Sequence, residues 1–259
     1  MASLTRELAL ILDMDGVIVD SNPVHRGVWA AYNRRFGIET DEAMQQRMYG
    51  RRNDDIVRDF FGGHLSPEEV RAHGAAKERL FRETIRPLLP EALVPGLRAF
   101  LERHRHQPLG LASNAEPENV NFLLDTARLR PYFRAIVDGH QVPRPKPHPE
   151  IYLQAAALLG AHPQDCVVFE DSFTGIQAAR AAGMAVVGVA TAHDELDGGP
   201  RDSGFLQPDT GAVAGNQVKS ETNDGTPDSR APFRLCVVRP KVQRSPTRET
   251  RPAFSGPRR

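Results

Sequence analysis

Five short apolar runs, separated by helical patterns, constrain the fold of this chain more than any other feature of its sequence. They cover residues 8–12, 108–112, 135–137, 167–169 and 185–189. Continuous apolar runs of this length are typical of strands that are buried on both faces of a sheet. Because strands that alternate with helices form βαβ units, the pattern predicts an α/β fold with a parallel, Rossmann-like sheet.

Helical patterns fill the spaces between the later runs. They cover residues 96–104, 117–127, 149–159 and 174–182. Gly160 and Gly183 follow two of these stretches, where a helix often ends in a left-handed residue. In open parallel sheets, ligands bind beyond the carboxyl ends of the strands. The residues directly after each apolar run are therefore the candidate site residues.

The stretch between residues 21 and 92 has a different pattern, because it contains helical segments and no convincing strand. These segments cover residues 24–36, 41–48, 54–61 and 67–86. Ser66-Pro67-Glu68-Glu69 is a good helix start, with Ser as the N-cap and Glu at the third helical position. We predict a core formed by residues 1–20 and 93–199, and an all-helical cap, 21–92, inserted after the first strand. Such an insert would lie over the carboxyl edge of the sheet, where a lid is useful.

The segment 200–259 differs from both regions in composition. It holds 11 Lys and Arg, 6 Asp and Glu, and 13 Gly and Pro residues. Such a segment buries too little apolar surface to offset the entropy of ordering it. We expect a disordered, solvated basic tail, in which only residues 233–238 could form a strand. Whether this patch supplies a last strand, or the core lacks an edge element, stays open at this point.

Composition argues against several classes of protein. The chain carries 33 basic and 33 acidic residues, and this balance argues against a nucleic-acid-binding surface over the whole protein. Two cysteines exclude a disulfide scaffold and a four-cysteine zinc site. No apolar run reaches the roughly 18 residues of a spanning helix, and the N-terminus has no signal-peptide pattern. We expect a cytoplasmic monomer that binds neither membranes nor nucleic acid.

Acidic residues follow two of the apolar runs. Asp13-Met14-Asp15-Gly16 comes directly after the first run, and Glu170-Asp171 comes after the fourth. Parallel strands bring these ends to the same edge of the sheet, where the carboxylates would repel one another. A hard divalent cation with oxygen ligands relieves this repulsion, and Mg²⁺ fits best. A surface Asp-x-Asp-Gly turn is the alternative explanation of the first motif alone.

Two further motifs could bind phosphate. Ser113-Asn114 follows the second run at a strand-to-helix turn, where a hydroxyl, an amide and a helix N-terminus can hold phosphate oxygens. Lys146 stands between Pro145 and Pro147, which stiffen its loop. Each motif alone has a simpler explanation, as an N-cap pair and as a solvated loop lysine.

The order and the strand-end placement of these motifs resemble the haloacid dehalogenase superfamily. The resemblance covers roughly residues 7–195 and is closest to the branch of β-phosphoglucomutase and related sugar-phosphate phosphatases. The motifs that match are Asp13-Met14-Asp15-Gly16-Val17, Ser113, Lys146, Glu170-Asp171, residues 20–25 and residues 175–179. The helical insert is placed like the cap of that family.

This resemblance implies a phosphoryl-transfer mechanism. It implies that Asp13 is the nucleophile that forms an aspartyl phosphate. It also implies that Asp15 protonates the leaving oxygen and then activates water or a second hydroxyl. Asp15 would hold a proton at neutral pH, so we expect neighbouring anions to raise its pKa. The true dehalogenases lack this second acid, so phosphate ester chemistry is favoured.

The resemblance further implies the ligands of the site. Those expected for Mg²⁺ are Asp13, Asp15 through its carbonyl, Glu170 and Asp171, and those for the phosphoryl group are Ser113, Asn114 and Lys146. Substrate choice would lie in the cap, where Arg51 and Arg52 could grip a distal phosphate, and where His25 and Lys77 match functional positions. For both of these, a solvated helix-face residue is the alternative.

The sequence therefore predicts a Mg²⁺-dependent phosphatase of a small phosphomonoester, such as a sugar phosphate. One alternative is a sugar phosphomutase of the β-phosphoglucomutase type, which the poorly matching loop 50–54 makes less favoured. A third possibility is a catalytically impaired binding protein that recruits a partner through its basic tail.

Overall fold

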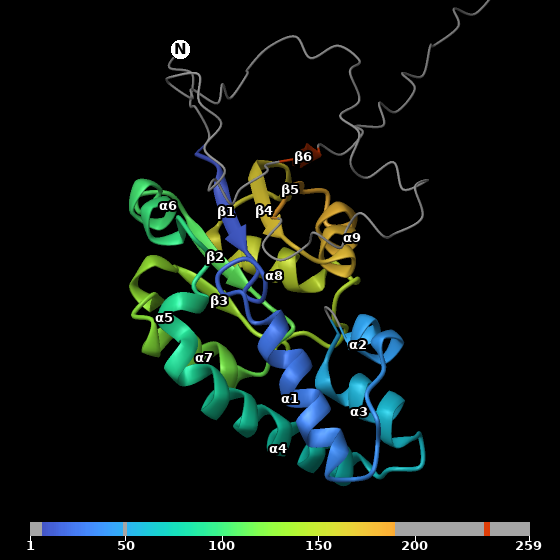
Figure 1. The fold of residues 1–259 in the computed structure, drawn as a ribbon. Coiled ribbons are helices and arrows are strands. Elements are labelled where there is room, and N and C mark those ends of the chain that lie inside the picture. Colours follow the sequence, from blue (N-terminus) through green and yellow to red (C-terminus); the bar gives the residue numbers. More distant parts are fainter. Residues whose placement is uncertain (1–6, 49–50, 190–235, 239–259) are drawn as a thin grey trace, which may run out of the picture.

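A computed structural model describes residues 7–48, 51–189 and 236–238 (Figure 1). Its centre is a six-stranded sheet with the order β3-β2-β1-β4-β5-β6. The strands are β1 Ala9–Leu12, β2 Leu109–Ala112, β3 Ala135–Val137, β4 Cys166–Glu170, β5 Ala185–Gly188 and β6 Cys236–Val238. The first five are parallel, as the apolar runs predict, because each is covered on both faces.

The edge strand β6 shows that part of the predicted tail supplies a last strand of the sheet. It pairs antiparallel with β5, with Val237 opposite Val187. The candidate strand at 233–238 is thus realised over three residues and covers the edge of the parallel sheet. The rest of the expected tail lies outside the described residues.

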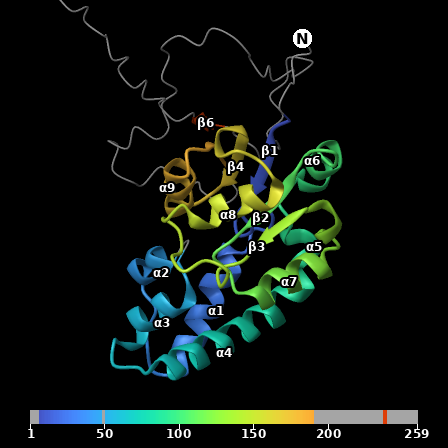
Figure 2. The same cartoon turned by 180° about the vertical axis from the view of Figure 1, so that it is seen from behind.

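Four helices pack on the two faces of the sheet. They are α6 Leu97–Arg103, α7 Pro117–Thr126, α8 Glu150–Leu159 and α9 Phe173–Ala181. The first two contribute Leu101 and Leu124 to the apolar core on one face, whereas α8 and α9 contribute Ile151 and Ile176 to the core on the other. Figure 2 shows α8 from this second side. Gly160 ends α8 with a φ of 67°, as predicted for a left-handed C-cap.

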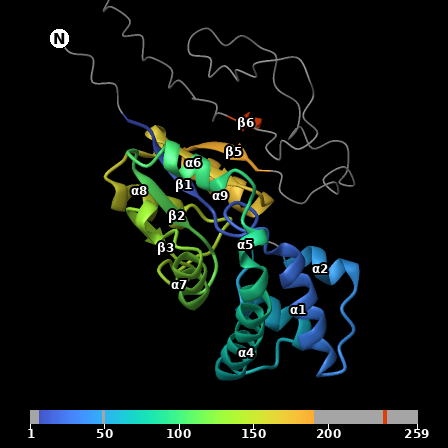
Figure 3. The same cartoon turned by 60° about the vertical axis from the view of Figure 1, so that its left-hand side comes forward.

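In the described part of residues 21–92 the regular elements are all helices, and they lie below the carboxyl ends of the strands (Figure 3). Its helices are α1 Asn22–Arg34, α2 Glu42–Met48, α3 Asn53–Phe61, α4 Pro67–Ile85 and α5 Leu89–Ala92. Short 3₁₀ helices cover Arg86–Leu88, Arg130–Tyr132 and Pro163–Asp165. The predicted capping box at Ser66 is present, because Ser66 and Glu69 exchange hydrogen bonds.

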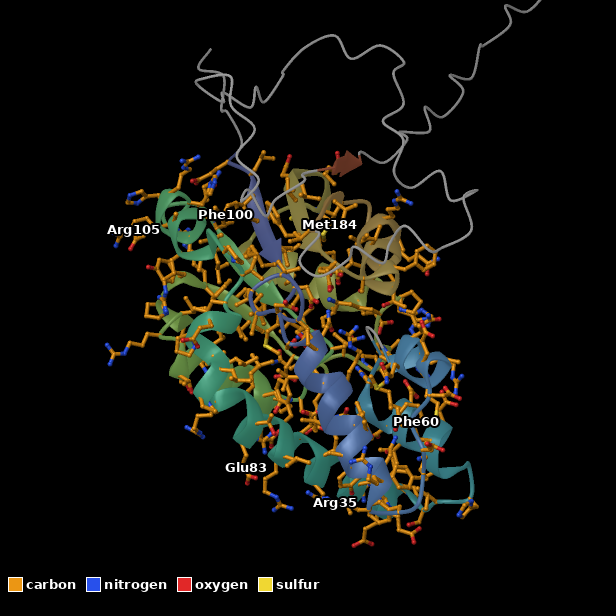
Figure 4. All side chains as sticks on the ribbon, in the orientation of Figure 1. Arg35, Phe60, Glu83, Phe100, Arg105 and Met184 are labelled. Atoms are coloured by element: carbon orange, nitrogen blue, oxygen red, sulfur yellow. The ribbon has the colours of Figure 1, made fainter. Side chains whose placement is uncertain are left out.

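The helical region has its own apolar core. Trp29, Tyr32, Val57 and Phe60 belong to a cluster that is separate from those at the sheet. In Figure 4, Phe60 lies in this helical region, while Met184 lies beside the sheet. Val28, Phe81 and Ile85 of the helical region belong instead to the cluster on one face of the sheet, so the two regions share apolar packing around the neck where the chain passes between them.

Two chain crossings form this neck. One leads out of β1 into α1, and the other returns from α5 toward α6. They run side by side, since Asp20 N–H donates to the Ala92 carbonyl at 2.7 Å and Val94 N–H donates to the Ile18 carbonyl at 3.0 Å. This arrangement places α1 and α4 over the edge at which Asp13 lies. No helix in the described part of the chain is both long and apolar enough to cross a membrane.

Candidate active site

Two predicted site residues, Asp13 and Ser113, lie at neighbouring strand ends because the strands are in register. Leu12 is aligned with both Leu111 and Phe169, so the strands next to β1 end at about the same level. Asp13 N–H continues the ladder by donating to the Phe169 carbonyl at 3.0 Å. Ser113 N–H donates to the Val137 carbonyl at the same distance. The sheet itself thus fixes the backbone of the nucleophile candidate and of the phosphate-binding candidate.

Gly16 allows the first acidic loop to approach Asp171. Its φ is +74°, a conformation that costs little only for glycine. A Cβ atom at this position would lie 1.8 Å from Asp171 Oδ2. The glycine of the Asp-x-Asp-Gly motif therefore serves both the turn and the close contact between the two acidic loops.

Lys146 ties two of these carboxylates together. Its Nζ donates to Asp13 Oδ1 and to Glu170 Oε1, both at 2.7 Å, and to the Ala112 carbonyl at 3.1 Å. The lysine is only 5% exposed. Burial lowers the pKa of Lys146, but the charges of Asp13 and Glu170 outweigh it, so the net effect raises the pKa. Lys146 is therefore a fixed cation and not a solvated loop lysine.

Glu170 is the last residue of β4 and is fully buried. Besides Lys146, its Oε1 accepts a hydrogen bond from Tyr152 Oη at 2.8 Å. Its Oε2 accepts from Ser172 N–H at 2.8 Å and from Ser172 Oγ at 2.9 Å. A Cβ atom on Gly175 would lie 1.6 Å from Oε1, so only glycine fits there. These donors hold Glu170 as the anchor of Lys146 and of the loop that precedes α9.

The cluster of Asp13, Glu170 and Asp171 fits a divalent cation. One carboxylate oxygen from each residue lies within 4.8 Å of the others. Burial, together with Glu170 and Asp15, raises the pKa of Asp13 to about 7 against the opposing effect of Lys146. Burial, Glu170 and Asp13 also raise the pKa of Asp171 well above its usual value. Three carboxylates share one lysine here, and this excess of oxygen ligands matches the chemistry of Mg²⁺.

Asp15 faces the helical region. Ser21 Oγ donates to its Oδ1, and His25 Nε2 lies 3.6 Å from the same oxygen. Burial raises the pKa of Asp15, but the interactions with His25 and Ser21 outweigh it and lower the pKa. The predicted rise of this pKa is therefore wrong for this structure, because residues around the start of α1 stabilise the charged form. Asp13 and Asp171 show the predicted effect of neighbouring anions instead.

His25 and Lys77 contact each other, and neither is a solvated helix-face residue, since Lys77 is buried and His25 is partly buried. Lys77 is 1% exposed, and its Nζ lies 2.7 Å from both His25 Nδ1 and Glu78 Oε1. Because an ammonium group only donates, His25 Nδ1 accepts, and the ring proton belongs on Nε2, which faces Asp15. The His25 ring also stacks on Phe81, with 3.8 Å between the ring centroids. The helical region thus orients the imidazole toward Asp15.

Asn114 braces the Lys146 loop, since Lys146 N–H donates to Asn114 Oδ1 at 3.2 Å. Ser113 Oγ accepts from Ala115 N–H at 3.2 Å, and the serine is 1% exposed. Both side chains line the same cavity as Asp13.

The two arginines of the cap loop are bound to protein groups. Arg51 Nη1 donates to Asp59 Oδ2 at 2.9 Å. Arg52 crosses to the sheet domain, where its Nη2 donates to the Val142 carbonyl at 2.6 Å. Both residues line the cavity, and Arg52 Nε is buried without a hydrogen-bond partner among the described residues, so the grip on a distal phosphate stays a prediction.

A cavity of about 480 Å³ joins these groups, a volume within the range of small-molecule sites. Of the predicted residues, only Glu170 does not line it. The others that do are Asp13, Asp15, His25, Arg51, Arg52, Lys77, Ser113, Asn114, Lys146 and Asp171. The structure therefore gathers residues from both regions of the chain around one space.

Sequence reasoning missed several polar residues of the site. They are Asn22, which donates to Asp171 at 3.1 Å, and Asn53, Glu78, Glu116, Asn119 and Tyr152. Tyr152 carried a signal, because it is a hydroxyl on the otherwise apolar face of the helix at 149–159. Glu116 carried none, since an acid near the start of a helix is ordinary.

The parallel sheet, the helices on both faces and the acidic strand ends define a Rossmann-like α/β protein with a candidate active site at the carboxyl edge of its sheet. The chain belongs to the haloacid dehalogenase-like hydrolases, whose family model matches residues 8–183. The expected superfamily and its branch are thereby confirmed.

Curated relatives include phosphatases and a mutase. The chain is 33% identical to fructose-1-phosphate phosphatase of Escherichia coli over 71% of this chain and 97% of that protein. It is 32% identical to β-phosphoglucomutase of Bacillus subtilis over 73% of this chain and 85% of that one. Among solved structures, β-phosphoglucomutase of Clostridium difficile matches with a TM-score of 0.67 and 28% identity, over 74% of this chain and 88% of that one.

Proposed function

We propose that this protein is a Mg²⁺-dependent phosphatase that hydrolyses a small phosphomonoester through an aspartyl phosphate on Asp13. The observation that carries the proposal is the shared position of Asp13, Lys146 and Asp171 at one end of the cavity, with Asp15 turned toward the cap. An excess of buried carboxylate at such a site needs a cation, and a phosphoryl group needs the cation and the lysine.

In the first half of the proposed reaction, an oxygen of the Asp13 carboxylate attacks phosphorus. The bond from phosphorus to the substrate oxygen breaks, and that oxygen takes a proton from Asp15. For this step the negative charge of the bound phosphomonoester would have to raise the pKa of Asp15, which His25 and Ser21 lower in this structure. Lys146 and Ser113 hold the phosphoryl oxygens as charge moves onto them. His25 and Ser21 hold Asp15 in place for the transfer.

In the second half, Asp15 accepts a proton from a water molecule, and this water attacks the phosphorus of the aspartyl phosphate. The bond between phosphorus and Asp13 breaks, so inorganic phosphate leaves and both aspartates return to their starting states. Asp13, Asp171 and the Asp15 carbonyl would hold Mg²⁺, which neutralises phosphate charge when bound. Glu170 would act mainly through its contacts with Lys146 and Ser172.

We propose that residues 21–92 form a cap that closes this site against bulk water. Two contacts between the regions support this assignment. Asn22 donates to Asp171 at 3.1 Å, and Arg52 reaches the carbonyl of Val142. The substrate would then be small enough to be enclosed in the cavity, as sugar phosphates are.

The relatives include phosphatases and a mutase, and these two activities give different products. Incubation with fructose 1-phosphate or glucose 1-phosphate and Mg²⁺ should release inorganic phosphate, whereas a mutase would give an isomeric phosphate without release. p-Nitrophenyl phosphate serves as a general substrate for the chemistry. If the wild type releases no phosphate from any of these esters, the phosphatase proposal fails and the binding-protein alternative gains weight.

A further inference from the structure

We infer that Tyr152 is a positioning residue for phosphoryl transfer: its hydroxyl group anchors Glu170, and through Glu170 it holds the ammonium group of Lys146 beside Asp13. The inference rests on the proposed function and deepens it, because it adds a residue of α8 to the machinery of the site. Tyr152 itself does not line the cavity, so it acts through its partners and not on the substrate.

Tyr152 places a polar group in an otherwise apolar layer. It lies in the first turn of α8 and is fully buried, as are Ile151, Ala155 and Ala156 of the same helix. All four belong to the apolar core on the α8 side of the sheet. A phenylalanine would serve this packing equally well, and a buried hydroxyl group is costly unless it has a hydrogen-bond partner. The hydroxyl group is therefore explained by its partner and not by the core.

That partner is Glu170 Oε1, which accepts from Tyr152 Oη at 2.8 Å and from Lys146 Nζ at 2.7 Å. The other oxygen, Oε2, accepts from the N–H and from the hydroxyl group of Ser172, at 2.8 Å and 2.9 Å. A carboxylate has about four positions that accept hydrogen bonds, so these four donors fill them. Without the phenol, Oε1 would keep only the lysine, and the carboxylate would lose one of the donors that fix its orientation.

Lys146 is fixed in the same way, because each of its three ammonium protons has an acceptor. The acceptors are Asp13 Oδ1 and Glu170 Oε1, both at 2.7 Å, and the Ala112 carbonyl at 3.1 Å. Its Nζ also lies 4.8 Å from the centroid of the Tyr152 ring, a distance at which a cation–π contact is favourable. Tyr152 therefore contacts the lysine through its ring and holds one of the lysine's acceptors through its hydroxyl group.

The proposed reaction depends on this placement. All three ammonium protons are in use, so Lys146 has to exchange one acceptor for a phosphoryl oxygen. While Glu170 keeps its orientation, the ammonium group stays beside Asp13, whose carboxylate attacks the phosphorus. If Glu170 turns in the absence of its tyrosine donor, Lys146 turns with it and stabilises the developing charge less well. This loss should lower kcat more than it raises KM, because the interaction is strongest in the transition state.

The test is hydrolysis of p-nitrophenyl phosphate by the full-length protein with saturating Mg²⁺, measured below the melting temperature of each variant. Tyr152→Phe keeps the ring and removes the hydroxyl group. We expect its kcat to fall by about tenfold and its KM to change by less than about twofold, since a hydrogen bond to a charged group has this size. Tyr152→Leu also removes the ring, so its kcat should be lower still.

Tyr132→Phe is the matched control. Tyr132 Oη donates to Glu102 Oε1 at 2.9 Å, and neither of these two residues lines the cavity. The same chemical change, the loss of one hydrogen bond between a phenol and a carboxylate, should therefore leave kcat and KM at their wild-type values.

A cycle of variants shows whether the effect passes through Lys146. Calorimetry measures the binding of orthovanadate, which mimics the transferred phosphoryl group, so that inactive variants can be compared in the presence of Mg²⁺. Tyr152→Phe should weaken this binding by about threefold or more when Lys146 is present, and by less than about twofold in the Lys146→Met background. If Tyr152→Leu or Lys146→Met does not fold, the kinetics of Tyr152→Phe decide.

Two results would overturn the inference. One is a Tyr152→Phe variant whose loss appears in KM or in thermal stability but not in kcat. The other is an equal loss of orthovanadate affinity with and without Lys146. Hydrolysis by the wild type would in both cases still support the phosphatase, whereas a wild type that hydrolyses no ester would contradict the proposed function itself, so the two failures are distinguishable.

Discussion

The sheet domain and the proposed cap, residues 21–92, each bury one lysine in contact with carboxylate groups, and the two clusters differ in their balance of charge. Lys77 in the proposed cap has one carboxylate partner, Glu78, and also contacts His25. Lys146 has to serve Asp13 and Glu170, while Asp171 lies close by. One lysine therefore meets one carboxylate in the proposed cap, whereas three carboxylates gather around one lysine in the sheet domain, and this excess of carboxylates supports the proposed cation site.

The pKa values of the two clusters follow from this difference. Burial alone would raise the pKa of any carboxyl group. In the cap, Lys77, His25 and Asn119 outweigh burial and lower the pKa of Glu78 to about 2. At the sheet edge, burial and like charges prevail and raise the pKa of Asp13 to about 7. A buried cluster in which cations match the carboxylates serves to position side chains. A buried cluster with more carboxylates than cations is a candidate site for a positively charged ligand.

The largest expected effect is the loss of activity in Asp13→Asn. The amide cannot act as the nucleophile, so hydrolysis of p-nitrophenyl phosphate should fall by about 10⁴-fold or more. The same change removes one of three crowded carboxylates, so the thermal midpoint without Mg²⁺ should stay equal or rise. Residual activity near the wild-type level would remove Asp13 from its proposed role.

Lys77→Met should act on stability first. It leaves Glu78 buried without its cation, at a cost of about 3–5 kcal/mol in the free energy of unfolding. The double variant Lys77→Met/Glu78→Gln should recover much of this loss, which urea denaturation can measure. If Lys77→Met is as stable as the wild type, the cap cluster is not held together by this ion pair.

The free energy of unfolding should depend on pH through Glu78. The pKa of Glu78 is lowered in the folded state, from an ordinary 4.5 to about 2. Its stabilising contribution is therefore present above about pH 4.5 and is lost as the pH falls toward 2. The difference in unfolding free energy between wild type and Glu78→Gln should shrink over this range by up to about 3 kcal/mol. A difference that does not change with pH would mean that Glu78 is not stabilised as a charge.

A pair of glycine substitutions gives the smallest effects. Gly175→Ala would push a methyl group into the Glu170 carboxylate, so it should cost about 1–3 kcal/mol and reduce activity with it. Gly27→Ala in α1 meets no atom within 4 Å and should be neutral or stabilising by up to about 1 kcal/mol. Thermal melts of both variants make the comparison. Equal melting temperatures for the two variants would mean that the close contact between residue 175 and Glu170 does not affect stability.

Local sequence signals predicted the helices and strands well. Contacts between residues far apart in the sequence could not be predicted in the same way. The helix predicted at 67–86 is α4, Pro67–Ile85, because Ser66 and its capping partner mark the start unambiguously. The expected rise in the pKa of Asp15 failed because only the fold shows that Ser21 and His25 face it. Arg51 could be recognised as a cation, but its partner Asp59 could not be inferred from the sequence alone. The sequence alone does not show which charged residues of different helices and strands pair with one another.

Calorimetric titration with Mg²⁺ measures whether the crowded carboxylates at the edge of the sheet bind a cation. The wild type should bind one Mg²⁺ per chain, and Glu78→Gln should bind it equally well because the cap cluster needs no further cation. Asp171→Asn should weaken binding by about tenfold or more, since it removes one anionic ligand. A wild type that binds no Mg²⁺, or an Asp171→Asn variant that binds it as tightly as the wild type, would contradict the account.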